Sequence, residues 1–113
     1  MGPLRVLPGR LSVSRTFGDI EAKLERFGGK PNVVIAEPDL RSFKILPEHD
    51  FIAIASDGIF DKMSSQDVVD IVIKHIMTSD DIHAGCSLGV EGVLKESINR
   101  KTMDNITVVV VAF

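Results

Sequence analysis

The sequence predicts an α+β fold whose C-terminal part runs strand, helix, helix, strand. Two apolar segments, Phe51–Ser56 and Ile106–Phe113, have the composition of buried strands. Between them, residues 64–98 carry apolar side chains at helical spacing. Shorter strand-like segments precede this unit, so we expect antiparallel β-sheet flanked by helices.

The N-terminal part of the chain is expected to hold short strands. Arg10–Thr16 and Val33–Ala36 are strand-like, and Leu40–Ile45 is a weaker strand candidate. Phe27–Asn32 reads as a loop because it contains two glycines and a proline.

The two apolar segments are predicted to be central strands. Phe51–Ser56 shows no alternation of apolar and polar residues and ends at the turn former Asp57-Gly58, which favours a strand buried on both faces. Ile106–Phe113 is too short for a typical buried helix, so we expect a second buried strand there.

A first helix is predicted to begin after Ser64, because Ser64–Asp67 combines a favoured N-cap residue with an early acid. Asp70 and Lys74 form a favourable pair four residues apart. The expected apolar stripe consists of Val69, Val72, Ile73 and Ile76.

A second helix is predicted within Asp80–Ile98, where its two leading acids suit a helix N-terminus. Gly85, Gly89 and Gly92 oppose this assignment, since each costs about 1 kcal/mol relative to alanine inside a helix. Close packing against a neighbouring element would explain them. The expected apolar stripe is Ile82, Cys86, Val90, Val93 and Leu94.

Length and composition limit the classes of function. The chain has 113 residues, 44% of them hydrophobic and 26% charged, which fits one folded domain and excludes a disordered tail. The net charge of −3 gives no overall attraction to nucleic acid or to an anionic membrane, so we expect neither as a partner. The single cysteine, Cys86, cannot form an intramolecular disulfide, which fits a cytoplasmic or nuclear location.

This predicted topology makes three acids candidate metal ligands. Antiparallel pairing of the two apolar strands would place Asp57 beside Asp104, with Asp61 shortly after Asp57. Carboxylates this close repel one another, and a divalent cation relieves the repulsion. Oxygen ligands favour Mg²⁺ or Mn²⁺. The alternative is that Asp-Gly and Asp-Asn only form turns, which is the more common role of these pairs.

Four segments in order carry a resemblance to a known family. Leu11–Asp19, Ala36–Asp39, Ala55–Asp61 and Met103–Val108 resemble motifs of the metal-dependent type 2C protein serine/threonine phosphatases. Any one segment would be a weak signal, whereas four in the same order are a strong one. The resemblance covers the C-terminal portion of that catalytic domain, so residues 1–113 are expected to be a single partial domain.

The resemblance implies a fold and a site. The fold would be part of a four-layer α-β-β-α sandwich of two antiparallel sheets flanked by helices, with two Mg²⁺ or Mn²⁺ ions between the sheets. Asp57 and Asp104 match metal ligands of the family, and Asp61 matches an acid at a further, weaker metal position. Supporting or structural roles are implied for Gly58, Asn105, Arg15 and Asp19.

The expected function is dephosphorylation of phosphoserine and phosphothreonine in proteins by metal-activated water. The family's Asp-Gly-His-Gly-Gly segment, an upstream acidic ligand and an early phosphate-binding arginine have no counterpart in this sequence. We therefore expect the isolated chain to be an incomplete catalytic domain with weak or no activity. The alternative is a non-catalytic module that binds a protein partner or self-associates through exposed sheet edges.

Overall fold

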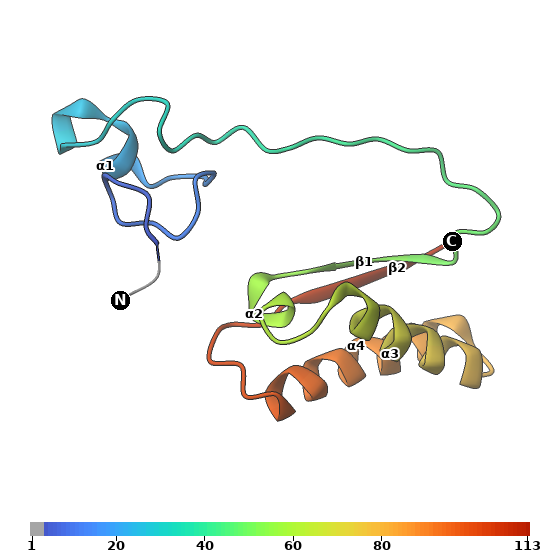
Figure 1. Cartoon of the computed structure of the whole chain (residues 1–113). Coiled ribbons are helices and arrows are strands. Elements are labelled where there is room, and N and C mark those ends of the chain that lie inside the picture. The colour runs from blue at the N-terminus through green and yellow to red at the C-terminus, as the bar shows by residue number, and fades with distance from the viewer. Residues whose placement is uncertain (1–3) are drawn as a thin grey trace. The chain divides into compact units, whose positions relative to one another are not determined.

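A computed structural model describes residues 4–113 of the chain (Figure 1). Contacts divide the chain into two compact units, an N-terminal unit that ends at Lys44 and a C-terminal unit that comprises Ile45–Phe113. The C-terminal unit contains the strands and the two long helices. The mixed α and β content expected from the sequence is confirmed.

Two strands form the sheet of the C-terminal unit. β1 (Phe51–Ala55) and β2 (Val108–Ala112) pair antiparallel, with Phe51 opposite Ala112 and Ala55 opposite Val108. Both strands and their antiparallel pairing agree with the prediction. β1 leads through Ser56 into α2 (Asp57–Phe60), a single helical turn where the sequence had suggested only a turn.

Two long helices connect the strands and cover one face of the sheet (Figure 1). α3 (Ser65–Thr78) begins at Ser64, whose hydroxyl accepts from the backbone of Asp67 while the Asp67 carboxylate accepts from the backbone of Ser64. This capping box satisfies amide groups that a helix N-terminus otherwise leaves without partners. α4 (Ile82–Asn99) begins at Asp81, which accepts from the amide of Ala84. The strand-helix-helix-strand order is confirmed.

Close contact between α3 and α4 explains the glycines of the second helix. A Cβ at Gly85 would lie 2.8 Å from the Cα of Ile76, and one at Gly89 would lie 3.2 Å from the Cα of Val72. The backbone of α3 therefore occupies the space that side chains on α4 would need. The predicted reason for these glycines is correct.

The core lies between the helices and the sheet, and its lining differs from the predicted stripes. On α4 the buried line is Gly85, Gly89, Val93 and Ser97, whereas Ile82 keeps 45% of its surface exposed. The small residues permit the closest approach and so decide which side of α4 faces α3. On α3 the buried residues are Val68 and Val72, and Val69 is 39% exposed. The buried core consists of Ile59, Met63, Val68, Val72 and Val93.

The predictions that β1 is buried on both faces and that β2 is a second buried strand are wrong. Ala53 and Val110 pack against the core from the helix side of the sheet. On the opposite face, Ile54 is 60% exposed, Val109 49% and Val111 46%. The described helices of the C-terminal unit cover only one face of the sheet, so the apolar side chains of the other face remain in contact with solvent.

The N-terminal unit contains a short helix, α1 (Ile20–Lys23), and a 3₁₀ turn, η1 (Glu25–Phe27). The strands predicted at Arg10–Thr16, Val33–Ala36 and Leu40–Ile45 are absent from the described part of the chain. In their place are isolated bridges, Val6 with Leu11 and Arg15 with Ile35.

Two features explain this difference at Arg10–Thr16 and Val33–Ala36. Positive φ angles at Arg10 and Asn32, 55° and 65°, take the backbone out of the extended region at or next to the predicted strands. Each bridge also joins only one residue pair, whereas a strand requires a ladder of such pairs. Within residues 4–113, no helix is both long enough and apolar enough to cross a membrane.

Candidate metal centre

Asp57 stands at the point where β1 ends and α2 begins. It is exposed, and one of its carboxylate oxygens, Oδ1, accepts a hydrogen bond of 3.1 Å from the amide of Gly58. Its backbone carbonyl accepts from the amide of Asp61 at 2.7 Å, which closes the turn of α2. The local backbone thus fixes one carboxylate oxygen of Asp57, and no described residue hydrogen bonds to the other.

Asp104 lies in the loop that leads from α4 into β2 and repeats this arrangement. Its Oδ1 accepts from the amide of Asn105 at 2.7 Å, and its side chain is exposed. Pairing of Ala55 with Val108 brings this loop beside the start of α2. Both acids are therefore held by the amide of the next residue, at neighbouring positions on one end of the sheet.

Hydrogen bonds join the segments that carry the two acids. The amide of Ser56 donates to the carbonyl of Thr107 at 3.0 Å, and the amide of Thr107 donates to Oγ of Ser56 at 3.1 Å. Oγ of Ser56 also donates to the carbonyl of Asn105 at 3.4 Å. On the other side, Oγ1 of Thr102 donates to the carbonyl of Gly58 at 2.9 Å. Asp57 and Asp104 thus stand between two cross-links.

Gly58 is the point of closest approach between these segments. It is buried, and a Cβ at this position would overlap the carbonyl oxygen of Asn105. Sequence reasoning marked Gly58 and Asn105 but missed Ser56 and Thr102 as the connecting side chains. The position of Ser56 next to Asp57 could have suggested its role, whereas nothing in the sequence relates Thr102 to Gly58, 44 residues away.

The expectation that three carboxylates converge is not met. Within residues 4–113, no group of three or more His, Cys, Asp or Glu side chains is placed to hold a metal ion. Asp61 follows the turn of α2 as its C-cap, and its amide closes that turn. Two carboxylates fit Mg²⁺, which proteins often bind through one or two carboxylates together with waters and substrate phosphates. They do not by themselves make a complete two-ion site.

Arg15 and Asp19 belong to the N-terminal unit. Arg15 donates to the carbonyl of Glu37 at 2.8 Å and forms an ion pair of 3.2 Å with Asp39. It thereby links the first two of the four segments that carry the family resemblance. Asp19 precedes α1 with a positive φ of 49°, and its carbonyl accepts from the amide of Ala22.

Comparison with known proteins decides the family. The family model described as Protein phosphatase 2C matches residues 4–106. The chain belongs to the protein phosphatase 2C family. Asp57, Asp61 and Asp104 all fall inside the matched range.

Curated relatives agree with this family. The chain is 35% identical over 107 residues to probable protein phosphatase 2C 58 and 36% identical over 107 residues to probable protein phosphatase 2C 11, both from Oryza sativa subsp. japonica. It is 31% identical over 107 residues to probable protein phosphatase 2C 21 from Arabidopsis thaliana. These alignments cover 93% of the chain but only 29%, 30% and 30% of the relatives, respectively. The chain thus spans less than a third of the length of each relative.

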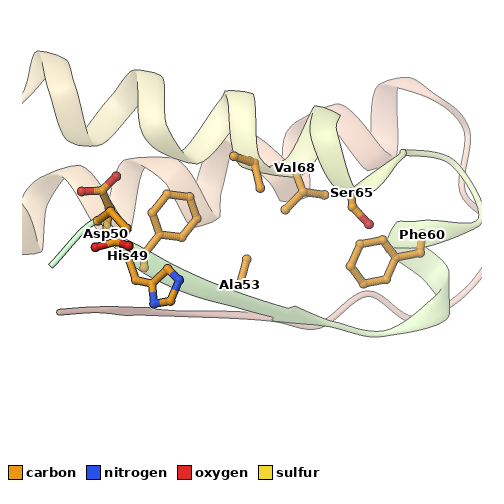
Figure 2. A pocket seen from close by; sticks show the side chains of 9 residues that line it. His49, Asp50, Ala53, Phe60, Ser65 and Val68 are labelled. Carbon is orange, nitrogen blue, oxygen red and sulfur yellow. The ribbon is translucent and has the colours of Figure 1, made fainter. Parts of the chain in front are cut away.

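A cavity of about 310 Å³ lies between β1 and α3 in this protein phosphatase 2C chain (Figure 2). Phe51, Phe60 and Val68 contribute apolar walls, and His49 and Asp50 lie at one end. Asp57, Asp61 and Asp104 do not line it. The cavity is therefore separate from the candidate metal centre.

Proposed function

We propose that this chain supplies part of the metal site of a protein phosphatase that hydrolyses phosphoserine and phosphothreonine. The observation that carries the proposal is the cross-linking of the Asp57 and Asp104 segments by Ser56 and Thr102. Family membership supports phosphatase chemistry in general. The four-layer sandwich and its two metal ions belong to the proposal for the complete domain, of which residues 1–113 form one part.

In this proposal the residues of the chain hold the cation and orient its ligands. Asp57 and Asp104 would each bind through the carboxylate oxygen that accepts no hydrogen bond from the described residues, while the amides of Gly58 and Asn105 fix the other oxygen. Asp61 would serve a further, weaker position. A bound Mg²⁺ or Mn²⁺ would supply an acidified water and neutralise negative charge on the phosphoryl group. The substrate would be a phosphoprotein.

Hydrolysis of an aryl phosphate by the 113-residue chain, with and without Mn²⁺, tests this function. We expect at most weak hydrolysis, because the sequence has no counterpart of the family's Asp-Gly-His-Gly-Gly segment or of its upstream acidic ligand. Any hydrolysis should require Mn²⁺ and should be lost in Asp57→Ala, while Asp80→Asn, which changes an exposed acid before α4, should not alter it. Metal-dependent hydrolysis that persists in Asp57→Ala would contradict the assignment.

The exposed sheet face favours a second candidate function, a non-catalytic module that self-associates or binds a protein partner. Apolar side chains on that face are widely accessible: Ile54, Val109, Val111 and Phe113 are between 46% and 60% exposed. A contiguous apolar surface of this kind commonly marks an interface. Sedimentation equilibrium would reveal a dimer that Ile54→Lys converts to a monomer. A chain that is monomeric at all concentrations, together with an upstream coding sequence for Asp-Gly-His-Gly-Gly, would favour a part of a phosphatase over a non-catalytic module.

A further inference from the structure

Two side chains in the loop between the end of α4 and β2 bind the backbone of the turn that begins at Asp57. Oγ1 of Thr102 donates to the carbonyl of Gly58 at 2.9 Å, and Nη1 of Arg100 donates to the carbonyl of Lys62 at 3.1 Å. The two carbonyls lie on either side of Ile59–Asp61. In and just after α2, the carbonyls of Asp57 and Ile59 accept from the backbone amides that follow them, whereas those of Gly58 and Lys62 accept from these two side chains of another element.

The same loop continues directly to Asp104. Thr102 is two residues before Asp104, and its amide donates to the carbonyl of Ser97 at 3.1 Å, which anchors the loop to the end of α4. A displacement of the Thr102 hydroxyl would therefore change the spacing between the Gly58 backbone and the Asp104 backbone. Within residues 4–113, Thr102 has the only hydroxyl of α4 or the following loop that is hydrogen bonded to the backbone of α2.

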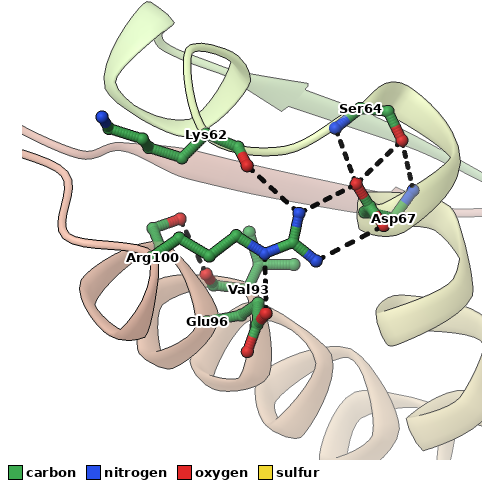
Figure 3. Close-up of polar contacts among 7 residues, drawn as sticks. Lys62, Ser64, Asp67, Val93, Glu96 and Arg100 are labelled. Atoms are coloured by element: carbon green, nitrogen blue, oxygen red, sulfur yellow. Dashed lines mark hydrogen bonds and ion pairs between the residues drawn. The ribbon is translucent and has the colours of Figure 1, made fainter.

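Arg100 makes the second of these two contacts, with the carbonyl of Lys62 (Figure 3). Its guanidinium reaches Glu96 at 2.7 Å and Asp67 at 3.1 Å as well as the carbonyl of Lys62. Asp67 also completes the capping box of α3, since its carboxylate accepts from the backbone amide and the hydroxyl of Ser64. The end of α4, the start of α3 and the residue after the α2 turn thus meet at one side chain.

We propose that Thr102 and Arg100 are positioning residues that set the distance between the carboxylates of Asp57 and Asp104. This inference rests on the proposed function, because it concerns the same metal site. Thr102 provides the sharper test: Thr102→Val keeps the branched shape and removes the donor, while Thr102→Ser keeps the donor. Groups that support a metal ligand typically change metal affinity about 10- to 100-fold when they are removed.

The first measurement uses the ¹⁵N-labelled 113-residue chain without metal. We expect Thr102→Val to shift the backbone amide resonances of Asp57, Gly58, Asp104 and Asn105, and Thr102→Ser to return them close to the wild-type positions. Thr78→Val is the matched control, because the Thr78 hydroxyl donates to the carbonyl of Lys74 within α3 at 2.8 Å. Unchanged resonances at the two acids in Thr102→Val, in a chain that unfolds at the wild-type urea concentration, would overturn the proposal.

The second measurement adds Mn²⁺ and follows paramagnetic broadening of the Asp57 and Asp104 amides. We expect both to broaden together in the wild-type chain, at Mn²⁺ concentrations about 10- to 100-fold higher in Thr102→Val and near wild type in Thr102→Ser and Thr78→Val. Equal affinity in Thr102→Val and wild type would overturn the positioning role alone. No broadening of either acid in the wild-type chain would contradict the proposed function, and the positioning role would fail with it.

Discussion

Replacement of Gly58 by alanine should destabilise the chain through the contact that joins its two acid-bearing segments. Alanine gains about 1 kcal/mol over glycine in helical backbone. Against this, the new Cβ would overlap the carbonyl oxygen of Asn105, and forcing an atom into a packed site costs about 1–3 kcal/mol. Separating the segments would also weaken the bonds made by Thr102 and Ser56, each worth about 0.5–1.5 kcal/mol. We expect a net loss of about 2 kcal/mol in the free energy of unfolding.

Urea unfolding followed by far-ultraviolet circular dichroism measures this loss, and Gly92→Ala is the matched control. A Cβ at Gly92 would lie 2.9 Å from Cγ2 of Ile71 and 3.1 Å from Nε2 of His75. Both neighbours are side-chain atoms, whereas the carbonyl of Asn105 is backbone. We expect Gly92→Ala to change the free energy of unfolding by less than about 1 kcal/mol. A Gly58→Ala chain as stable as wild type would refute the close contact between the two segments.

Three further predictions concern the C-terminal unit. Val93→Ala removes part of a fully buried side chain, so urea unfolding should show a loss of about 2 kcal/mol, and a neutral result would contradict the described core. Ser64→Ala removes the N-cap of α3 and should cost about 1 kcal/mol in the same assay, with wild-type stability counting against the capping box. Hydrogen bonds from the backbone and hydroxyl of Ser64, and then from Arg100, lower the pKa of Asp67 from 3.8 to about 2. The stability from this shift is therefore present above pH 4 and lost as the pH falls towards 2, and Asp67→Asn should remove that part of the pH dependence of unfolding.

The C-terminal unit could be predicted well from the sequence because its signals are local and periodic. Ser64 is the N-cap of α3, as its position before an early acid indicated, and both strands form where the apolar runs lie. Gly85 and Gly89 also proved informative, since glycine inside a helix has few reasons other than close packing. The buried line on α4 could not be read from hydrophobicity, because small residues rather than large ones face α3.

The structure of the N-terminal unit and the finer features of the site could not be predicted, because they depend on contacts between residues distant in sequence. Arg10–Thr16 has strand-like composition, but its bridge at Arg15 joins it to Ile35 at one residue pair only. The prediction of an acid pair at one end of the sheet followed from antiparallel pairing alone, whereas the hydroxyl of Thr102 reaches Gly58 only because α4 returns the chain to that place. The expected convergence of Asp61 with the other acids is not found, since no group of three such side chains within residues 4–113 is placed to hold a metal ion.

Binding of Mn²⁺ to the 113-residue chain, measured by electron paramagnetic resonance, tests the central claim most directly. We predict that the wild-type chain binds Mn²⁺ and that Asp57→Asn and Asp104→Asn each lower the affinity at least about tenfold, the smaller end of the range for groups that only support a ligand. Asp80→Asn should bind as wild type does. A wild-type chain that binds no Mn²⁺, or binding that survives the loss of both Asp57 and Asp104, would contradict the assignment of these two acids as metal ligands.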